Sequence, residues 1–471
     1  MGIETKIKRL FVLMLENRSF DNLLGWSDLR GWQPDGTPTQ ADTLVGKQPY
    51  INTSIDAPQR SVQHPIGHGA PFRLNFDPGH EFSDVLVQLC RDAAANIPGS
   101  CVKDTLNLDA AGTYPSMSLN PNQLGYAECM QEHGLDIASA LTCFTPNQLP
   151  VINFLASQFA VCDRWFSSMP GPTLPNRFFA LAGTSWGIDY SPSDFSVIDS
   201  EFFTGKFGTG SDSLLTRLAP EEWLVAYGDT PLAWTLNGVG DDVHRARFIR
   251  QQELINSLKD GHLDDSVKFV FIEPHYDPIG SFRDGESMHP TGDVRKGEAL
   301  IKSVYEAFKN SKYWLDSALL ITFDEHGGFF DHVIPDPNAG VVPVLAPSKP
   351  TGMQHNFQFD RYGIRVPAIV VSPFVRQATI DHTFYDHLSI AKTLADIARP
   401  GGAVPLLDTD RFRSANSFAG LFTLSQPRAA ADIPECPPPV PMGAQTAPTA
   451  PGPTARVFSN VGWPPDPLGG A

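Results

Sequence analysis

Four short runs of mostly apolar residues end abruptly in polar residues. They cover residues 9–15, 268–272, 318–323 and 366–371, and polar side chains such as Glu16 and Asp324 follow at once. Apolar runs without polar alternation are typical of strands buried on both faces. Apolar residues recur at helical spacing in 298–310 and 387–398. The alternation predicts an α/β fold, with a mostly parallel central sheet and helices on both faces.

The predicted catalytic domain spans residues 1–426 and includes two long insertions. Residues of about 33–78 and 191–240 are rich in glycine, proline and aspartate without clear periodicity, so we expect loops there. Proline dominates residues 427–471, which predicts an extended C-terminal tail. In a parallel sheet, ligands bind beyond the carboxyl ends of the strands, where the polar residues described above fall.

Charge and composition narrow the class of protein. A formal net charge of -17 over 471 residues argues against a general nucleic-acid binder, which needs a basic surface. We expect no transmembrane segment, since no apolar stretch approaches the ~20 residues that span a bilayer. The N-terminus lacks a signal-peptide pattern, so we expect either a cytoplasmic protein or a mature secreted form. Oligomeric state is not determined.

The six cysteines do not indicate a disulfide scaffold. None belongs to a CxxC pair, so their spacing does not predict a thiolate zinc site. One or two disulfides and buried thiols are both compatible with the pattern.

The first chemical motif is ENRSFD at residues 16–21, directly after a predicted strand. The carboxylate of Glu16 and the amide oxygen of Asn17 suit a hard cation that prefers oxygen ligands. The alternative is a helix N-cap provided by Asn17 or Ser19.

The second motif is DEHGG at residues 324–328, followed by Asp331 and His332. Its acids and histidines form a dense set of metal ligands, and the glycines let the backbone approach an ion closely. The alternative is a loop whose charged residues face water. Burying three ionisable residues costs stability unless they are used, which favours a site.

The third motif is MPGPTLPNRF at residues 169–178, where prolines and glycine surround one hydroxyl. Thr173 is a candidate metal-activated nucleophile, and Asn176 with a helix N-terminus could bind phosphate oxygens. The alternative is a proline-rich turn in which Thr173 caps a helix. His80 and His289 are isolated in the sequence, and they become candidates only beside these motifs.

Taken together, the three motifs resemble the bacterial phosphoesterase family that contains phosphatidylcholine-type phospholipases C and an acid phosphatase branch. This resemblance spans about residues 6–398 and implies an alkaline phosphatase-like fold. It implies that Thr173 contacts a single metal ion and attacks phosphorus. The resemblance also implies that the other ligands of this metal ion are Glu16, Asn17, Asp324 and Glu325. It further implies that His80, Asn176 and His289 hold phosphate oxygens or assist the leaving group.

The resemblance therefore predicts a metal-dependent phosphodiester hydrolase of phospholipase C type that forms a covalent phosphothreonine. Its substrate would be a phosphoester such as a phospholipid head group. An acid phosphatase with the same site is the first alternative, and a non-catalytic metal-stabilised binding module is a remote one. The oxygen-rich ligand set favours calcium over magnesium, manganese or zinc.

Overall fold

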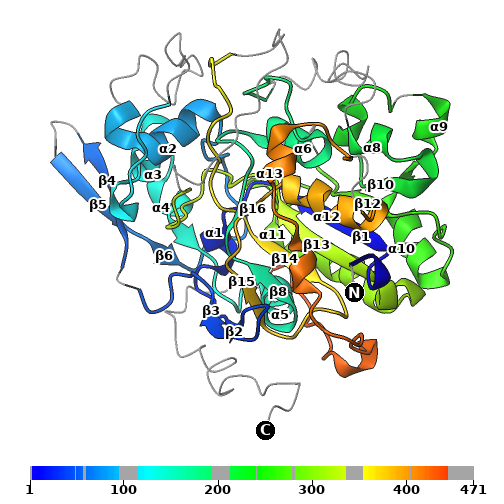
Figure 1. Cartoon of the computed structure of the whole chain (residues 1–471). Coiled ribbons are helices and arrows are strands. Elements are labelled where there is room, and N and C mark those ends of the chain that lie inside the picture. Colours follow the sequence, from blue (N-terminus) through cyan, green and yellow to red (C-terminus); the bar gives the residue numbers. More distant parts are fainter. Residues whose placement is uncertain are drawn as a thin grey trace.

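The computed structural model describes residues 3–47, 49–56, 60–94, 114–191, 213–239, 241–277, 282–335, 354–401 and 405–443. Within these ranges a ten-stranded sheet forms the centre of the molecule, in the order β11-β10-β12-β1-β13-β14-β8-β15-β2-β3 (Figure 1). Helices pack against both of its faces.

The strands of this sheet are β1 (Arg9–Leu15), β2 (Arg30–Trp32), β3 (Pro38–Gln40), β8 (Ala160–Cys162), β10 (Trp223–Tyr227), β11 (Phe248–Arg250), β12 (Phe269–Glu273), β13 (Ser317–Phe323), β14 (Ala368–Val371) and β15 (Thr379–Asp381). The smaller sheets contain β4 (Ile51–Asp56), β5 (Arg60–Pro65), β6 (Gly67–His68), β7 (Thr142–Cys143), β9 (Trp165–Phe166) and β16 (Tyr385–Asp386). The α-helices are α1 (Phe20–Leu24), α2 (Phe82–Ala94), α3 (Tyr126–Glu132), α4 (Ile137–Ala140), α5 (Pro150–Gln158), α6 (Thr173–Ala182), α8 (Leu214–Arg217), α9 (Asp242–Arg245), α10 (Gln251–Asp260), α11 (Val294–Lys309), α12 (Leu388–Ala398) and α13 (Asp410–Ser414).

Strands β10, β12, β1 and β13 form a parallel core, which confirms the predicted fold class. In their pairing, Leu10 lies beside Phe269 on one side and Ala318 on the other. Every residue of β1, β12 and β13 is buried. Burial on both faces explains why these segments are apolar without alternation.

Strand β14 runs antiparallel to its neighbour β13, so the sheet is not fully parallel. It pairs antiparallel with β13, with Leu319 beside Val371, so the residues after the two strands emerge at opposite edges. Ser372 accordingly donates to the carbonyl of Ser317 at 3.1 Å, at the amino end of β13. An apolar run indicates burial but carries no information on strand direction. Ser372 is therefore remote from Asp324, which follows β13.

The two predicted loop insertions contain regular structure. In the first, Ile51–Asp56 and Arg60–Pro65 form the antiparallel hairpin β4–β5, at one side of the molecule beside α3 (Figure 1). In the second, Trp223–Tyr227 is a strand of the central sheet, paired with β12. Residues 192–212 lie outside the described residues. The apolar stretch WLVAY was the available signal for the missed strand.

The described beginning of the predicted tail packs on the body of the protein. Arg428 donates to the carbonyl of Gln158 at 2.6 Å, and Trp314 donates to the carbonyl of Arg428 at 2.9 Å. Cys436 is buried. Residues 444–471 lie outside the described residues.

Two groups of helices cover the sheet. Helices α5, α10 and α11 pack together against it, and α6, α12 and α13 form the second group. The predicted helices at 298–310 and 387–398 correspond to α11 and α12. Among the described helices, none combines the length and apolar character needed to cross a bilayer.

Candidate active site

The first two motifs meet where β1 and β13 end side by side. The amide of Asp324 donates to the carbonyl of Leu15 at 3.2 Å, and the amide of Asn17 donates to Asp324 Oδ1 at 3.1 Å. The amide of Arg18 donates to the carbonyl of Glu325 at 3.0 Å. Residues that are 307 positions apart in the sequence thus form one polar cluster.

The helix-cap alternative for the first motif is confirmed at Ser19, and the metal-ligand role of Glu16 and Asn17 stays a prediction. Ser19 caps α1 by accepting the amide hydrogen of Asn22 at 3.1 Å. Glu16 and Asn17 precede that cap and face the cluster. Asn17 has the left-handed conformation, with φ of 56°, which is uncommon for a non-glycine residue and is found at functional sites.

Gly327 allows the second motif to lie against Asn17. Its φ is 66°, and a Cβ atom on this residue would stand 2.1 Å from the carbonyl oxygen of Asn17. Any side chain would therefore push the two motifs apart. Asp324, Glu325 and His326 are almost completely buried, so the alternative of a loop facing water is wrong.

The third motif places Thr173 beside Asn17. Helix α6 begins at Thr173, and Pro172 is its N-cap, so Thr173 is the first helical residue and not the cap. The hydroxyl of Thr173 donates to Asn17 Oδ1 at 3.4 Å. Asn17 Nδ2 lies 3.1 Å from Nε2 of His80. Asn17 therefore connects the candidate nucleophile to one of the candidate histidines.

Asn176 orders the loop that carries Thr173. Its side chain accepts the amide hydrogen of Met169 at 3.0 Å and donates to the carbonyls of Gly171 and Pro172 at 3.1 Å each. The side chain is fully buried. Its side-chain amide is therefore hydrogen-bonded to backbone atoms of the loop. This supports a positioning role rather than contact with phosphate.

Arg177 directly follows Asn176 and lies about one turn past Thr173 on α6. It was not among the predicted site residues. Its Nε donates to Asp324 Oδ2 at 2.9 Å, and its Nη2 donates to the carbonyl of Leu15 at 3.0 Å. It thereby joins the helix of the candidate nucleophile to the ends of both strands. The adjacent NR dipeptide was the only available signal.

The carboxylates of the cluster are buried, and their negative charge is not fully compensated by neighbouring groups. Burial raises the pKa of Glu16 to about 7, and burial also raises the pKa of Asp324 against the opposing effect of Arg177. Within the described part of the chain, Glu16 Oε2 and Glu325 Oε1 are buried without a hydrogen-bond partner. Buried carboxylate oxygens in this condition favour a bound cation, so the residues present fit a divalent metal.

Asp77 lies between the two candidate histidines, and sequence reasoning assigned it no role. Its carboxylate oxygens are 3.7 Å from Nδ1 of His80 and 3.4 Å from Nε2 of His289. The two imidazole centroids are 6.5 Å apart. Phe282 stacks on His289 at 4.0 Å. The structure thus brings His80 and His289 together at one side of the cluster.

The loop of His289 is tied to the first motif. Glu16 donates its amide hydrogen to the carbonyl of Ser287 at 2.8 Å, and Arg18 Nε donates to the carbonyl of Met288 at 2.8 Å.

His387 supports the second motif from the N-cap of α12, because its Nε2 lies 2.6 Å from the carbonyl of Asp324. Burial lowers the pKa of His387 to about 4, which keeps it neutral.

His332 belongs to a separate ion network. Asp21 lies 2.6 Å from its Nδ1, and Arg365 pairs with Asp21 at 3.0 Å and with Asp331 at 3.1 Å. Burial alone would lower the pKa of His332, but the carboxylate of Asp21 raises it to about 9. The guanidinium of Arg365 neutralises these acids, so a cation is not needed there.

The sequence of the chain is similar to those of known phosphoesterases. Residues 7–218 and 233–398 match the Phosphoesterase family. The chain is 31% identical to "Non-specific phospholipase C4" of Arabidopsis thaliana, over 91% of this chain and 74% of that protein. It is 26% identical to "Phospholipase C B" of Mycobacterium tuberculosis, over 90% of this chain and 79% of that protein.

Among solved structures, the chain resembles a protein of the alkaline phosphatase superfamily from Vibrio parahaemolyticus. The identity is 14% and the TM-score 0.33, over 54% of this chain and 61% of that chain.

A hydroxyl, carboxylates and histidines gather at the strand ends of the α/β sheet. The family match and the phospholipase C relatives assign the chain to the hydrolases of phosphoric esters. The chain belongs to the Phosphoesterase family. This assignment sets aside the alternative of a non-catalytic binding module.

Proposed function

We propose that this hydrolase cleaves phosphodiesters in the manner of a phospholipase C, with Thr173 as nucleophile and one divalent cation in the site. The observation that carries the proposal is the 3.4 Å contact between Thr173 Oγ1 and Asn17 Oδ1, inside a cluster of buried carboxylates. Similarity to phospholipases C of Arabidopsis and Mycobacterium supports a phosphodiester over a monoester.

The cation would be held by oxygen atoms of the three motifs. Its ligands would be Glu16, Asn17, Thr173, Asp324 and Glu325. When bound, a divalent ion lowers the pKa of a coordinated hydroxyl and neutralises phosphate charge. Calcium is the first candidate, because it tolerates irregular sets of carboxylate, amide and hydroxyl oxygens.

The residues of this chain would divide the reaction into two steps. In the first, the Thr173 hydroxyl gives its proton to His80 or His289 as Oγ1 forms a bond to phosphorus, and the bond from phosphorus to the leaving alcohol breaks. His80 or His289 gives the proton that the alcohol oxygen requires. In the second, water attacks the phosphothreonine with loss of a proton to the same histidine, which restores the threonine hydroxyl and releases a phosphomonoester.

Asn176 and Arg177 would act by position. Asn176 keeps the loop before Thr173 in one conformation through its three backbone partners. Arg177 keeps Asp324 oriented toward the cluster. Phosphoryl transfer depends mainly on such positioning and on charge stabilisation.

The test compares nitrophenyl-phosphorylcholine with nitrophenyl phosphate, with and without a chelator and added calcium. We expect chelator-sensitive hydrolysis that favours the choline diester and is restored by calcium. Preference for the monoester would contradict the diesterase proposal and assign the chain to the acid phosphatase branch. Full activity after chelation would contradict the role of the metal. Phosphatidylcholine vesicles then test a lipid substrate directly.

A further inference from the structure

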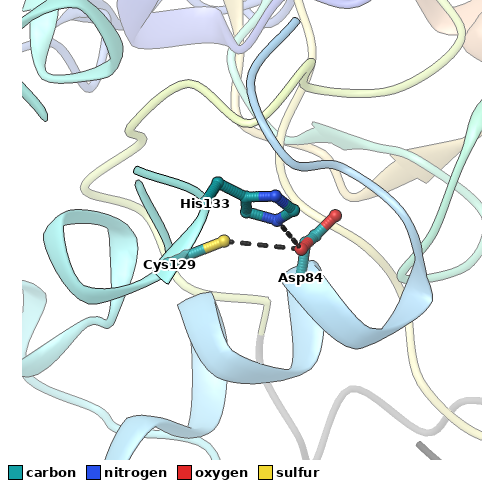
Figure 2. Close-up of side chains that lie close together, drawn as sticks. All are labelled: Asp84, Cys129 and His133. Atoms are coloured by element: carbon teal, nitrogen blue, oxygen red, sulfur yellow. Dashed lines mark hydrogen bonds and ion pairs between the residues drawn. The ribbon is translucent and has the colours of Figure 1, made fainter. Parts of the chain in front are cut away.

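Three metal-binding side chains meet in a second cluster, close to the active site but outside it (Figure 2). Asp84 is in the first turn of α2, Cys129 is in α3, and His133 is the C-cap of α3. Asp84 Oδ1 lies 2.7 Å from Nε2 of His133 and 3.6 Å from Sγ of Cys129. All three ligand atoms are within 4.8 Å of one another.

The cluster is buried on one side and open on the other. The side chain of Asp84 is 4% exposed and Cys129 is buried, whereas the side chain of His133 is 26% exposed. Gly79 closes the buried side, since a Cβ atom there would stand 2.7 Å from the carboxyl carbon of Asp84 and 2.8 Å from Nε2 of His133. Solvent therefore reaches the cluster on the side of His133.

We propose that Asp84, Cys129 and His133 bind a zinc-class divalent cation, with water as the fourth ligand. Carboxylate oxygen, thiolate sulfur and imidazole nitrogen are the three ligand types that zinc prefers. In a tetrahedral zinc site, neighbouring ligand atoms are separated by about 3.4 Å, as follows from metal–ligand distances of about 2.0–2.3 Å. The separation of Asp84 Oδ1 from Cys129 Sγ already fits, and its separation from His133 Nε2 would widen by about 0.7 Å.

The neighbouring charged residues distinguish this cluster from the group formed by Asp21, Asp331 and His332. That group already contains the guanidinium of Arg365. Around Asp84, the described residues include no ion pair with lysine or arginine, and its carboxylate contacts His133 instead. Asp84 Oδ2 accepts the amide hydrogen of Glu81 at 2.9 Å, which leaves Oδ1 directed at the other two ligands.

A bound cation would also fix the surroundings of the active site. Gln88 donates to the carbonyl of Gly79 at 2.7 Å and to Sγ of Cys129 at 3.7 Å. Its Oε1 is 2.7 Å from Nε2 of His326, whose Nδ1 is 3.3 Å from Glu325. The cation would therefore hold the start of α2 in place, directly after His80. Only this connection rests on the proposed function, and the cation site itself does not.

The experiment measures zinc bound per chain after the full-length protein is stripped with a chelator and exchanged into zinc alone. Cys129→Ser and His133→Gln are compared with wild type. Cys90→Ser is the matched control, because Cys90 is a buried cysteine of α2, the helix of Asp84, and contacts the carbonyl of Pro115 at 3.6 Å. We expect wild type and Cys90→Ser to hold one zinc more per chain than the other two variants, and zinc to raise their Tm.

Cobalt provides a second readout that does not depend on activity. We expect a thiolate-to-cobalt charge-transfer band in wild type and in Asp324→Asn, and its loss in Cys129→Ser. Asp324→Asn removes a ligand of the proposed catalytic cation only, so the two proposals can fail separately. Equal zinc content in all variants, or absence of the band in wild type, would overturn the proposal and leave a hydrogen-bonded network of the same residues.

Discussion

Arg177 and Asp324 form a buried ion pair that joins the helix of the candidate nucleophile to the end of the central strand β13. Arg177 Nε lies 2.9 Å from Asp324 Oδ2, and the two side chains are 3% and 0% exposed. The pair thereby sets the distance between α6, which begins at Thr173, and the predicted metal ligands.

Replacing Arg177 by methionine should destabilise the protein strongly. The change leaves the charge of Asp324 buried and without its partner, which typically costs about 3–5 kcal/mol. Urea denaturation in the presence of a chelator measures the free energy of unfolding without help from a metal. Arg399→Met is the control, since Arg399 pairs with Glu222 at 2.7 Å near the surface and such pairs contribute about 1 kcal/mol or less. Equal losses in the two variants would contradict the importance of the buried pair.

Thr173→Ala should lower kcat by at least about 1,000-fold, because it removes the proposed nucleophilic oxygen. Thr173 is the first residue of α6 and its side chain is not needed as a cap, so the fold should persist. Initial rates on nitrophenyl-phosphorylcholine give kcat, and circular dichroism checks the fold. Thr173→Ser keeps a hydroxyl and should retain turnover. An active alanine variant would end the assignment of the nucleophile.

Asp77→Asn should lower kcat by about 10- to 100-fold with little change in KM. Asp77 orients His80 and His289 from 3.7 and 3.4 Å, and loss of such an orienting partner commonly has an effect of this size. Asp28→Asn is a suitable control, because Asp28 pairs with the exposed Arg30 at 2.9 Å, outside the cluster. A rise in KM alone would indicate that Asp77 contacts the substrate rather than positioning the histidines.

The pair of Glu222 with Arg399 should make stability sensitive to acid. Hydrogen bonding from Arg399 lowers the pKa of Glu222 from 4.5 to about 2. The folded protein then binds fewer protons than the unfolded chain, so the contribution is present above pH 4.5 and is lost as pH falls toward 2. Glu222→Gln should be less stable than wild type by up to about 1 kcal/mol at pH 6. Urea midpoints at pH 6 and pH 3 should show this difference narrowing, and a constant difference would refute the link.

The sequence alone predicted the parallel strands and the site motifs that follow them. Strands β1, β12 and β13 are continuous apolar runs, and burial on both faces demands that pattern whatever the neighbouring strands are. The three motifs are local in the chain, so their residue types could be read without knowledge of the fold. Strand β10 also left a local apolar signal, although the surrounding glycines and acids obscured it.

Tertiary structure alone decided the direction of β14 and the partners of the site residues. Apolar content records that a strand is buried, but the hydrogen-bond register with β13 sets its direction. Likewise, Arg177 and Asp324 are 147 positions apart, and Asp84 and Cys129 are 45 apart. Such contacts arise from the packing of whole helices and strands, and the residues next to each partner in the chain carry no record of them.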